Sequence, residues 1–210
     1  MATKLGLYNG AAILLKERKL VALTDNTPLR QTLDLVYDDV IAYMLEQGMW
    51  NFAQRSVKLE PDPDVDTSFG YKNAFQQPSD MVRICKISAN ERFYPTLDEY
   101  LDEGTYFYAD IGEIFLSYVS DGASYGGDLS LWPATFARAV EFELALRVSP
   151  PVTKESAPAM QVLEKRAMTA LRDARSKDAM RQPVDRMQPG RLAQARRSRR
   201  NGGNGGLWDL

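Results

Sequence analysis

Carboxylates are the first side chains in this sequence that could do chemistry. Asp62, Asp64 and Asp66 alternate in the segment DPDVDTSFG, a spacing that invites comparison with a calcium-binding loop. An EF-hand loop needs a glycine at its sixth position and a bidentate glutamate at its twelfth. Thr67 and Asn73 occupy those positions here. The segment is therefore interpreted as a solvated acidic turn.

A second acidic group lies in LDEYLDEG, which contains Asp98, Glu99, Asp102 and Glu103. Paired carboxylates can act as general acid and general base. These four are adjacent in sequence, have no neighbouring His or Lys, and lie in a segment typical of an exposed turn. We expect a solvated face or a charged contact to a neighbouring subunit rather than a catalytic site.

The residue types that are missing exclude much of the remaining chemistry. The chain has no His and a single Cys, Cys85. Histidine is the commonest metal ligand and general base, so Ser-His-Asp and Cys-His arrangements are excluded, as is an intrachain disulfide. Cys85 lies in a strand-like segment and is predicted to be a small buried hydrophobic residue.

Two glycine-rich segments, GASYGG and NGGNGG, also invite a functional interpretation. Neither has the Lys-Ser/Thr pair of a phosphate-binding loop nor the spacing of a dinucleotide fingerprint. Both are interpreted as flexible linkers. Together, the motifs predict no enzyme, no metal and no cofactor.

The charge is unevenly distributed along the 210 residues. The formal net charge is −2, but residues 181–210 contain seven Arg and two Asp, a net charge of +5, which leaves −7 for the first 180 residues. An acidic body with a basic end predicts that the end serves a partner. The sequence shows no signal-peptide pattern and no apolar run long enough to span a membrane, which predicts a soluble intracellular protein without a membrane partner.

Helical periodicity occurs near both ends of the body. Residues 5–20 and 29–48 form two apolar stripes, and Thr27 and Pro28 are typical of a helix start. A third helix is predicted from Pro133 to the SPP segment at 149–151. A fourth is predicted to start between Thr153 and Pro158 and to end at Pro183.

Strand-like alternation dominates between these helical blocks. Aromatic and β-branched residues alternate with polar ones from Phe52 to Val119, with Asp, Gly, Asn and Pro between the segments. Five or six antiparallel strands are expected, including MVRICKIS and ERFYPTL, with ADIGE as a tight turn. In MVRICKI, simple alternation places Met81, Arg83, Cys85 and Ile87 on one face.

The order of elements predicts an α+β fold. Helices at both ends of the body must pack together to bury their apolar stripes. The expected architecture is a helical bundle formed by residues 1–51 and 131–182, an inserted antiparallel β-rich region at 52–130, and an extended, flexible basic arm at 183–210. Trp50 and Phe52 would fill the seam between the two layers.

The basic arm combines arginines with an apolar end. Arginine favours phosphate, but the arm has no aromatic residues between its arginines that would stack on bases. Trp208 is a typical interface anchor, so docking into a protein groove is considered beside nucleic-acid contact and a solubilising role. The docking residues would be Arg191, Arg196, Arg197, Arg199, Arg200, Leu207, Trp208 and Leu210.

Several motifs occur in a fixed order between about Leu5 and Met180. A Trp-Asn-Phe-Ala junction follows a helix, a Pro-x-Asp-x-x-Arg segment opens a strand, and a Leu-Trp-Pro segment opens a late helix. The residues that carry this pattern are Trp50, Asn51, Phe52, Ala53, Pro78, Asp80, Arg83, Trp132 and Pro133. In this order they resemble the head-to-tail adaptor proteins of short-tailed phages, also called tail tubular protein A.

The resemblance implies a structural virion protein. Members of that family form a ring, usually of twelve copies, beneath the portal protein; the ring continues the DNA channel and receives the tail nozzle protein. The expected location is the neck of the virion, after assembly in the host cytoplasm. The C-terminal extension, here 183–210, would reach the portal protein.

Two other function classes are compatible with the sequence. A nucleic-acid-binding accessory protein would use the Arg-rich tail. An enzyme of the lysis or packaging apparatus would have to work with Asp and Glu alone.

Overall fold

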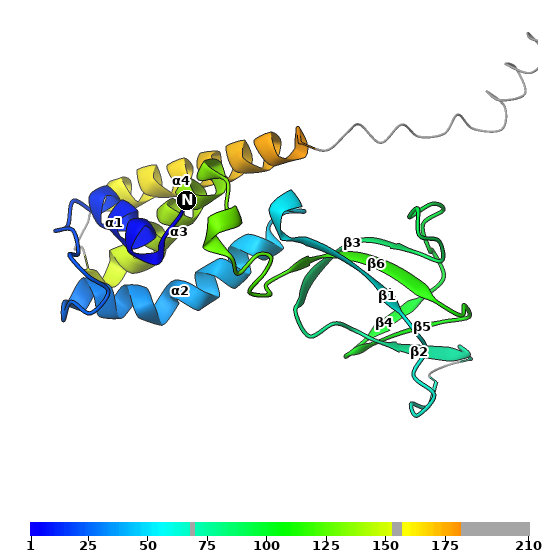
Figure 1. Cartoon of the computed structure of the whole chain (residues 1–210). Coiled ribbons are helices and arrows are strands. Elements are labelled where there is room, and N and C mark those ends of the chain that lie inside the picture. The colour runs from blue at the N-terminus through cyan, green and yellow to red at the C-terminus, as the bar shows by residue number, and fades with distance from the viewer. Residues whose placement is uncertain (68–69, 153–156, 182–210) are drawn as a thin grey trace, which may run out of the picture.

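In the computed structural model of the chain, residues 1–67, 70–152 and 157–181 are described. They form four α-helices and two three-stranded antiparallel sheets, with the helices at one end and the sheets at the other (Figure 1). This confirms the predicted α+β fold, in which the strands lie between two helical blocks. The predicted arm, 183–210, lies outside the described residues.

Two capped helices begin the chain. Helix α1 spans Lys4–Leu14 and helix α2 spans Pro28–Glu46. The hydroxyls of Thr3 and Thr27 accept hydrogen bonds from backbone N–H groups in the first turn of these helices, and Pro28 occupies a position where its missing N–H costs nothing. The predicted stripe of α2 is buried at Leu29, Leu33, Tyr37, Val40, Met44 and Leu45.

Two longer helices complete the bundle. Helix α3 spans Ala134–Val152 and helix α4 spans Ala157–Ala179. Helix α3 packs against α1, α2 and α4 and so forms the centre of the bundle. It extends past the predicted stop at Ser149 through Pro150 and Pro151 to Val152, since the fixed φ of proline lies in the helical range, although each proline removes one N–H bond to the preceding turn.

The strands form a small sandwich. One sheet has the order β1 (Gln54–Leu59), β6 (Ile114–Ser120), β3 (Met81–Ser88), and the other has the order β2 (Asn73–Gln76), β5 (Tyr106–Ala109), β4 (Leu101–Glu103). A hydrophobic cluster draws on both sheets and fills the space between them. Its buried members are Phe75, Ile87, Phe107, Ala109, Ile114, Leu116 and Tyr118.

One predicted strand is absent from the described residues, and one predicted turn joins two sheets. The segment ERFYPTL, residues 91–97, is a loop with a cis Tyr94–Pro95 peptide bond, not a strand. The turn ADIGE does lie between two strands, as predicted, but β5 and β6 belong to different sheets and form no hairpin. The hairpin of this region is instead formed by β4 and β5, with Gly104 at positive φ in its turn.

Strand β3 also departs from simple alternation. Its pairing with β6 shifts between Met81 and Arg83 and again between Ile84 and Lys86. Each bulge adds a residue that is not matched by the partner strand. As a result, Cys85 packs against the core of the helices, whereas Met81 and Ile84 pack against the cluster between the sheets. Both sides of β3 are therefore covered, but the side chains on each side differ from those that simple alternation predicts.

Within the described residues, no helix is both long enough and apolar enough to cross a membrane.

Candidate functional site at the helix–sheet junction

The sequence motifs meet where the bundle joins the sheets. Helix α2 ends at Glu46, and a single 3₁₀ turn, Asn51–Ala53, connects it to β1. From the other direction, a 3₁₀ turn at Leu129–Leu131 leads from β6 to α3. The chain therefore crosses the seam twice. The Trp-Asn-Phe-Ala motif lies at the first crossing and the Leu-Trp-Pro motif at the second, whereas the Pro-x-Asp-x-x-Arg motif lies at the start of β3.

Four aromatic rings fill this seam. Phe136 of α3 lies at the centre, with ring centroids 4.7 Å from Trp50, 4.8 Å from Phe52 and 4.8 Å from Trp132. Both indole N–H groups are satisfied, since Trp50 donates to the Met44 carbonyl at 2.8 Å and Trp132 donates to the Gly126 carbonyl at 2.8 Å. These rings bury apolar surface in the seam while their polar atoms stay hydrogen-bonded.

Asn51 links the 3₁₀ turn to the end of α4. Its backbone N–H donates to Oδ2 of Asp178 at 2.9 Å, and its side-chain amide donates to the Asp178 carbonyl at 2.7 Å. Oδ1 of Asp178 is buried without a hydrogen-bond partner in the described part of the chain. Burial raises the pKa of Asp178, although the bonds from Asn51 and the charge of Arg181 oppose the shift.

Asp80 joins the ends of three strands in the first sheet. Its carboxylate accepts hydrogen bonds from Arg55 of β1 at 2.9 Å, and from Tyr118 at 2.9 Å and Ser120 at 2.5 Å, both in β6. Burial by itself would raise the pKa of Asp80, but the bonds from Ser120, Arg55 and Tyr118 outweigh it and lower the pKa. Asp80 therefore stays ionised and fastens the start of β3 to its neighbours.

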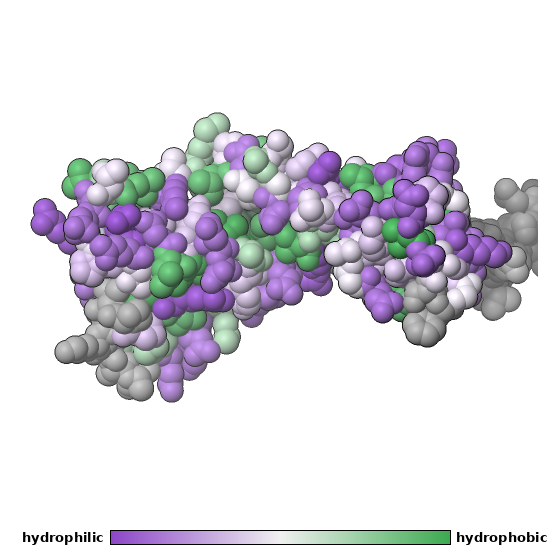
Figure 2. Space-filling view, turned by 90° about the horizontal axis from the view of Figure 1, so that it is seen from below, coloured by the Kyte–Doolittle hydropathy of each residue, from purple (hydrophilic) through white to green (hydrophobic). Residues whose placement is uncertain are grey.

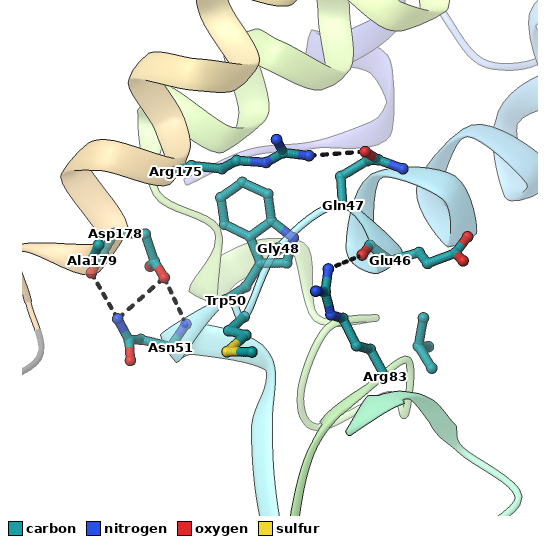
Figure 3. A pocket seen from close by; sticks show the side chains of 11 residues that line it. Glu46, Gln47, Gly48, Trp50, Asn51, Arg83, Arg175, Asp178 and Ala179 are labelled. Carbon is teal, nitrogen blue, oxygen red and sulfur yellow. Dashed lines mark hydrogen bonds between the residues drawn. The ribbon is translucent and has the colours of Figure 1, made fainter. Parts of the chain in front are cut away.

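Arg83 and Arg175 line a cavity of about 650 Å³ at the junction. Figure 3 shows Arg175 reaching toward Gln47, with Arg83 reaching the end of α2 from the side of the sheet. Arg175 donates to Oε1 of Gln47 at 2.8 Å and Arg83 donates to the Glu46 carbonyl at 2.9 Å. Both guanidinium groups are thus bonded to neutral acceptors at the C-terminal end of α2, where carbonyl groups lack helical partners.

The two motif prolines lie in turns next to α3 and β3, and Ala53 lies in the core. Pro133 immediately precedes α3, and its carbonyl accepts from the Ala137 N–H at 3.0 Å. The carbonyl of Pro78 accepts from the Met81 N–H at 3.1 Å in the turn before β3. Ala53 is fully buried in the core of the bundle.

Sequence reasoning missed part of this junction. The segment GASYGG, interpreted as a flexible linker, is a hydrogen-bonded turn in which the Gly126 N–H donates to the Ser120 carbonyl at 3.0 Å. A Cβ at Gly126 would overlap that carbonyl oxygen, and one at Gly48 would lie 2.8 Å from the Trp50 ring. The available signal was that Trp50 and Trp132 lie close in sequence to Gly48 and Gly126. A large indole near a glycine indicates that the glycine is needed for packing.

The residues considered for chemistry do not converge. Asp62, Asp64 and Asp66 lie in the loop after β1, and the Asp64 N–H donates to Asp62 at 3.1 Å. Asp102 lies in β4 and accepts from Gln77 at 2.6 Å. Cys85 is half-buried, and burial raises its pKa, with Arg83 opposing. No group of three or more His, Cys, Asp or Glu side chains within the described ranges could hold a metal ion.

The predicted docking residues all lie outside the described residues: Arg191, Arg196, Arg197, Arg199, Arg200, Leu207, Trp208 and Leu210. Their role stays a prediction. In comparisons with known proteins, no family model matches the chain, and no curated protein matches its sequence.

Proposed function

We propose that this chain is a structural virion protein, a head-to-tail adaptor that forms a ring beneath the portal protein and joins it to the tail nozzle protein. The ring, of twelve copies by resemblance, would continue the channel through which genomic DNA passes during ejection. It would be located in the neck of the virion after assembly in the host cytoplasm. The role is not enzymatic, and it requires no cofactor and no membrane.

The observation that carries the proposal is the set of hydrogen bonds made by the motif residues at the helix–sheet junction. Trp50, Asn51 and Trp132 use their polar groups on the protein itself, toward Met44, Asp178 and Gly126. Asp80 and Arg83 do the same across the strands and to the end of α2. Residues that bind a substrate would keep donors or acceptors for it. Trp50 and Asn51 instead bond the connecting turn to the helices, and Arg83 of β3 bonds to the end of α2, so the helical lobe and the β lobe are linked as a rigid ring subunit requires.

The basic arm would supply the contact to the portal protein. Its expected anchors are Leu207, Trp208 and Leu210, with the arginines from Arg191 to Arg200 adding charge. The ring would form after the portal is complete, so this contact would be made at that step of assembly.

Electron microscopy of the chain mixed with the portal ring of the same virus tests the proposal. A second ring stacked coaxially on the portal is the expected result. Intact portal rings without a second ring, in the presence of folded chain, would sink the adaptor role. A chain lacking residues 191–210 should lose binding, and Trp208→Ala should weaken it, whereas Leu131→Ala, which removes an exposed apolar side chain of the body, should not.

The Arg-rich arm also carries the alternative of a nucleic-acid-binding accessory protein. A DNA contact would show affinity that falls steeply with salt and is unchanged by Trp208→Ala. A protein-docking arm would depend on Trp208. The same variant therefore separates the two functions.

A further inference from the structure

The outer side of helix α2 is acidic. Asp38, Asp39 and Glu46 are exposed, and the sequence from Gln31 to Glu46 contains no Lys or Arg. Within the described part of the chain, these three carboxylates have no hydrogen-bond or ion-pair partner. Leu35 lies among them and is 80% exposed.

The fourth acid of this helix segment is partly exposed, but it is paired with other residues of the bundle. Asp34 accepts a hydrogen bond from the Tyr8 hydroxyl at 2.6 Å and pairs with Arg30 at 2.7 Å and Lys4 at 3.5 Å. The contrast separates one structural carboxylate from three that face outward.

A basic groove lies between α3 and α4. It encloses about 570 Å³, and its lining contains Arg138 from α3 with Lys165, Arg166 and Lys177 from α4, against one acid, Asp173. The lining also includes apolar residues, namely Leu14, Phe142, Val162 and Ala170. Val162 is 50% exposed. The groove therefore combines an apolar floor with positive charge.

The two surfaces lie on opposite sides of the bundle. Helix α3 packs between α2 and α4, and Figure 1 shows α2 along the lower edge and α4 along the upper edge. The view from below in Figure 2, onto the side of α2, is mostly hydrophilic with scattered apolar residues. One copy cannot bring these two faces together within itself, but two neighbouring copies can.

The dimensions of the two surfaces match. The exposed positions Leu35, Asp38, Asp39, Ala42 and Glu46 follow helical spacing over about 17 Å, and the groove from Val162 to Lys177 runs for about 22 Å along α4. An amphipathic helix in a groove is a common docking mode, read at spacings of three and four residues.

We propose that α2 of one copy docks into the α3–α4 groove of the next copy, with its outward carboxylates against the cations of the groove and Leu35 toward the apolar floor. The contact uses two different faces of the chain, so it propagates head to tail and closes into a ring if the rotation permits. It rests on the proposed function in one respect, because it supplies the contact between ring neighbours.

A charge swap tests this contact in the full chain. Sedimentation equilibrium at low salt should detect self-association of the wild-type chain, and added salt should weaken it. Asp38→Lys with Asp39→Lys should weaken association at least about tenfold, and so should Lys165→Glu with Arg166→Glu. An equimolar mixture of the two variants should restore association, because each reversed face then meets its complement.

The control changes the same charge elsewhere. Asp64 and Asp66 are exposed in the β lobe, so Asp64→Lys with Asp66→Lys should leave association unchanged. Recovery in the mixture also shows that both reversed variants are folded.

The contrary outcomes are equally defined. No self-association of the wild type, or a mixture no better than its components, overturns the contact. Loss only on reversing the groove would mean that another segment of the chain, such as Leu207–Leu210, occupies it, and would overturn the contact with α2. The assay contains no portal protein, so a chain that binds the portal but fails the swap keeps the adaptor role and loses this contact. A chain that passes the swap but does not bind the portal keeps this contact and loses the adaptor role.

Discussion

Two carboxylates at the junction show how surroundings decide the role of a residue. Asp80 receives three hydrogen bonds and has a lowered pKa, whereas Asp178 leaves one buried oxygen unpaired and has a raised pKa. The sequence placed Asp80 in a recognisable motif. It gave no sign that Asn51 would bond to Asp178, which lies 127 residues later in the chain. Contacts over such separations depend on the packing of whole elements, which no local pattern contains.

Replacing Asp80 by Asn should lower the free energy of unfolding by about 1–3 kcal/mol at pH 7, because charge-assisted bonds from Arg55, Tyr118 and Ser120 are lost or misdirected. The lowered pKa means that this contribution is fully present above the unfolded value near 3.9 and is lost as pH falls through the folded pKa. Urea unfolding of both proteins from pH 7 to pH 2 measures the difference. Lys58→Gln, at an exposed ion pair with Glu113, should cost little at any pH.

Asp178 should show the opposite pH dependence. Its raised pKa means that its contribution is fully present below the unfolded value and is lost as pH rises through the folded pKa. Asp178→Asn removes the buried charge and keeps an acceptor for the Asn51 N–H, so it should be at least as stable as wild type at pH 7. Asp178→Ala leaves that N–H without its acceptor and should cost about 1–3 kcal/mol. Equal losses in both variants would contradict the assigned role.

At the level of elements, the helices were more predictable than the strands. The stripe of α2 repeats over five turns, so both its existence and its buried face could be read from the sequence. Strand β3 could not, because two bulges redirect Cys85 and Ile84, and bulges depend on the partner strand. The loop containing Gly126 was misread for a similar reason: glycine marks both freedom and close approach, and only the neighbouring Ser120 carbonyl distinguishes them.

The turn at Gly126 should tolerate no side chain. Gly126→Ala would push its Cβ into the Ser120 carbonyl and against both methyl groups of Leu45, and it should cost about 2–3 kcal/mol. Chemical denaturation gives the value. Gly112→Ala is the matched control, because nothing lies within 4 Å of its added Cβ, so its stability should stay close to wild type. Equal effects of the two substitutions would show that the turn yields.

At the scale of the whole molecule, two hydrophobic clusters are joined by one seam. One cluster fills the bundle and the other fills the space between the sheets. That division into helical and β-rich parts could be anticipated from the order of patterns along the chain. The boundaries assigned to the parts stay a prediction, and so does the arm at 183–210, because its sequence can suggest a partner but cannot place it.

The seam should make the two lobes unfold together. Calorimetry of the wild type should give one transition. The ring centroids of Phe52 and Phe136 lie 4.8 Å apart in the seam. Phe52→Ala should therefore weaken the coupling between the two lobes, so that each lobe unfolds in its own calorimetric transition. By contrast, Phe107→Ala lies inside the sandwich, where it should lower stability by about 3–5 kcal/mol without separating them at the seam. A single, merely shifted peak in Phe52→Ala would show that other contacts couple the lobes.

The aromatic seam also makes the chain its own optical probe. Of the three tryptophans, Trp50 and Trp132 are buried in that seam, 1% and 5% exposed. In a Trp208→Phe chain, all indole emission would come from this one place. Its wavelength would then report whether water enters the joint when copies assemble, without any added label.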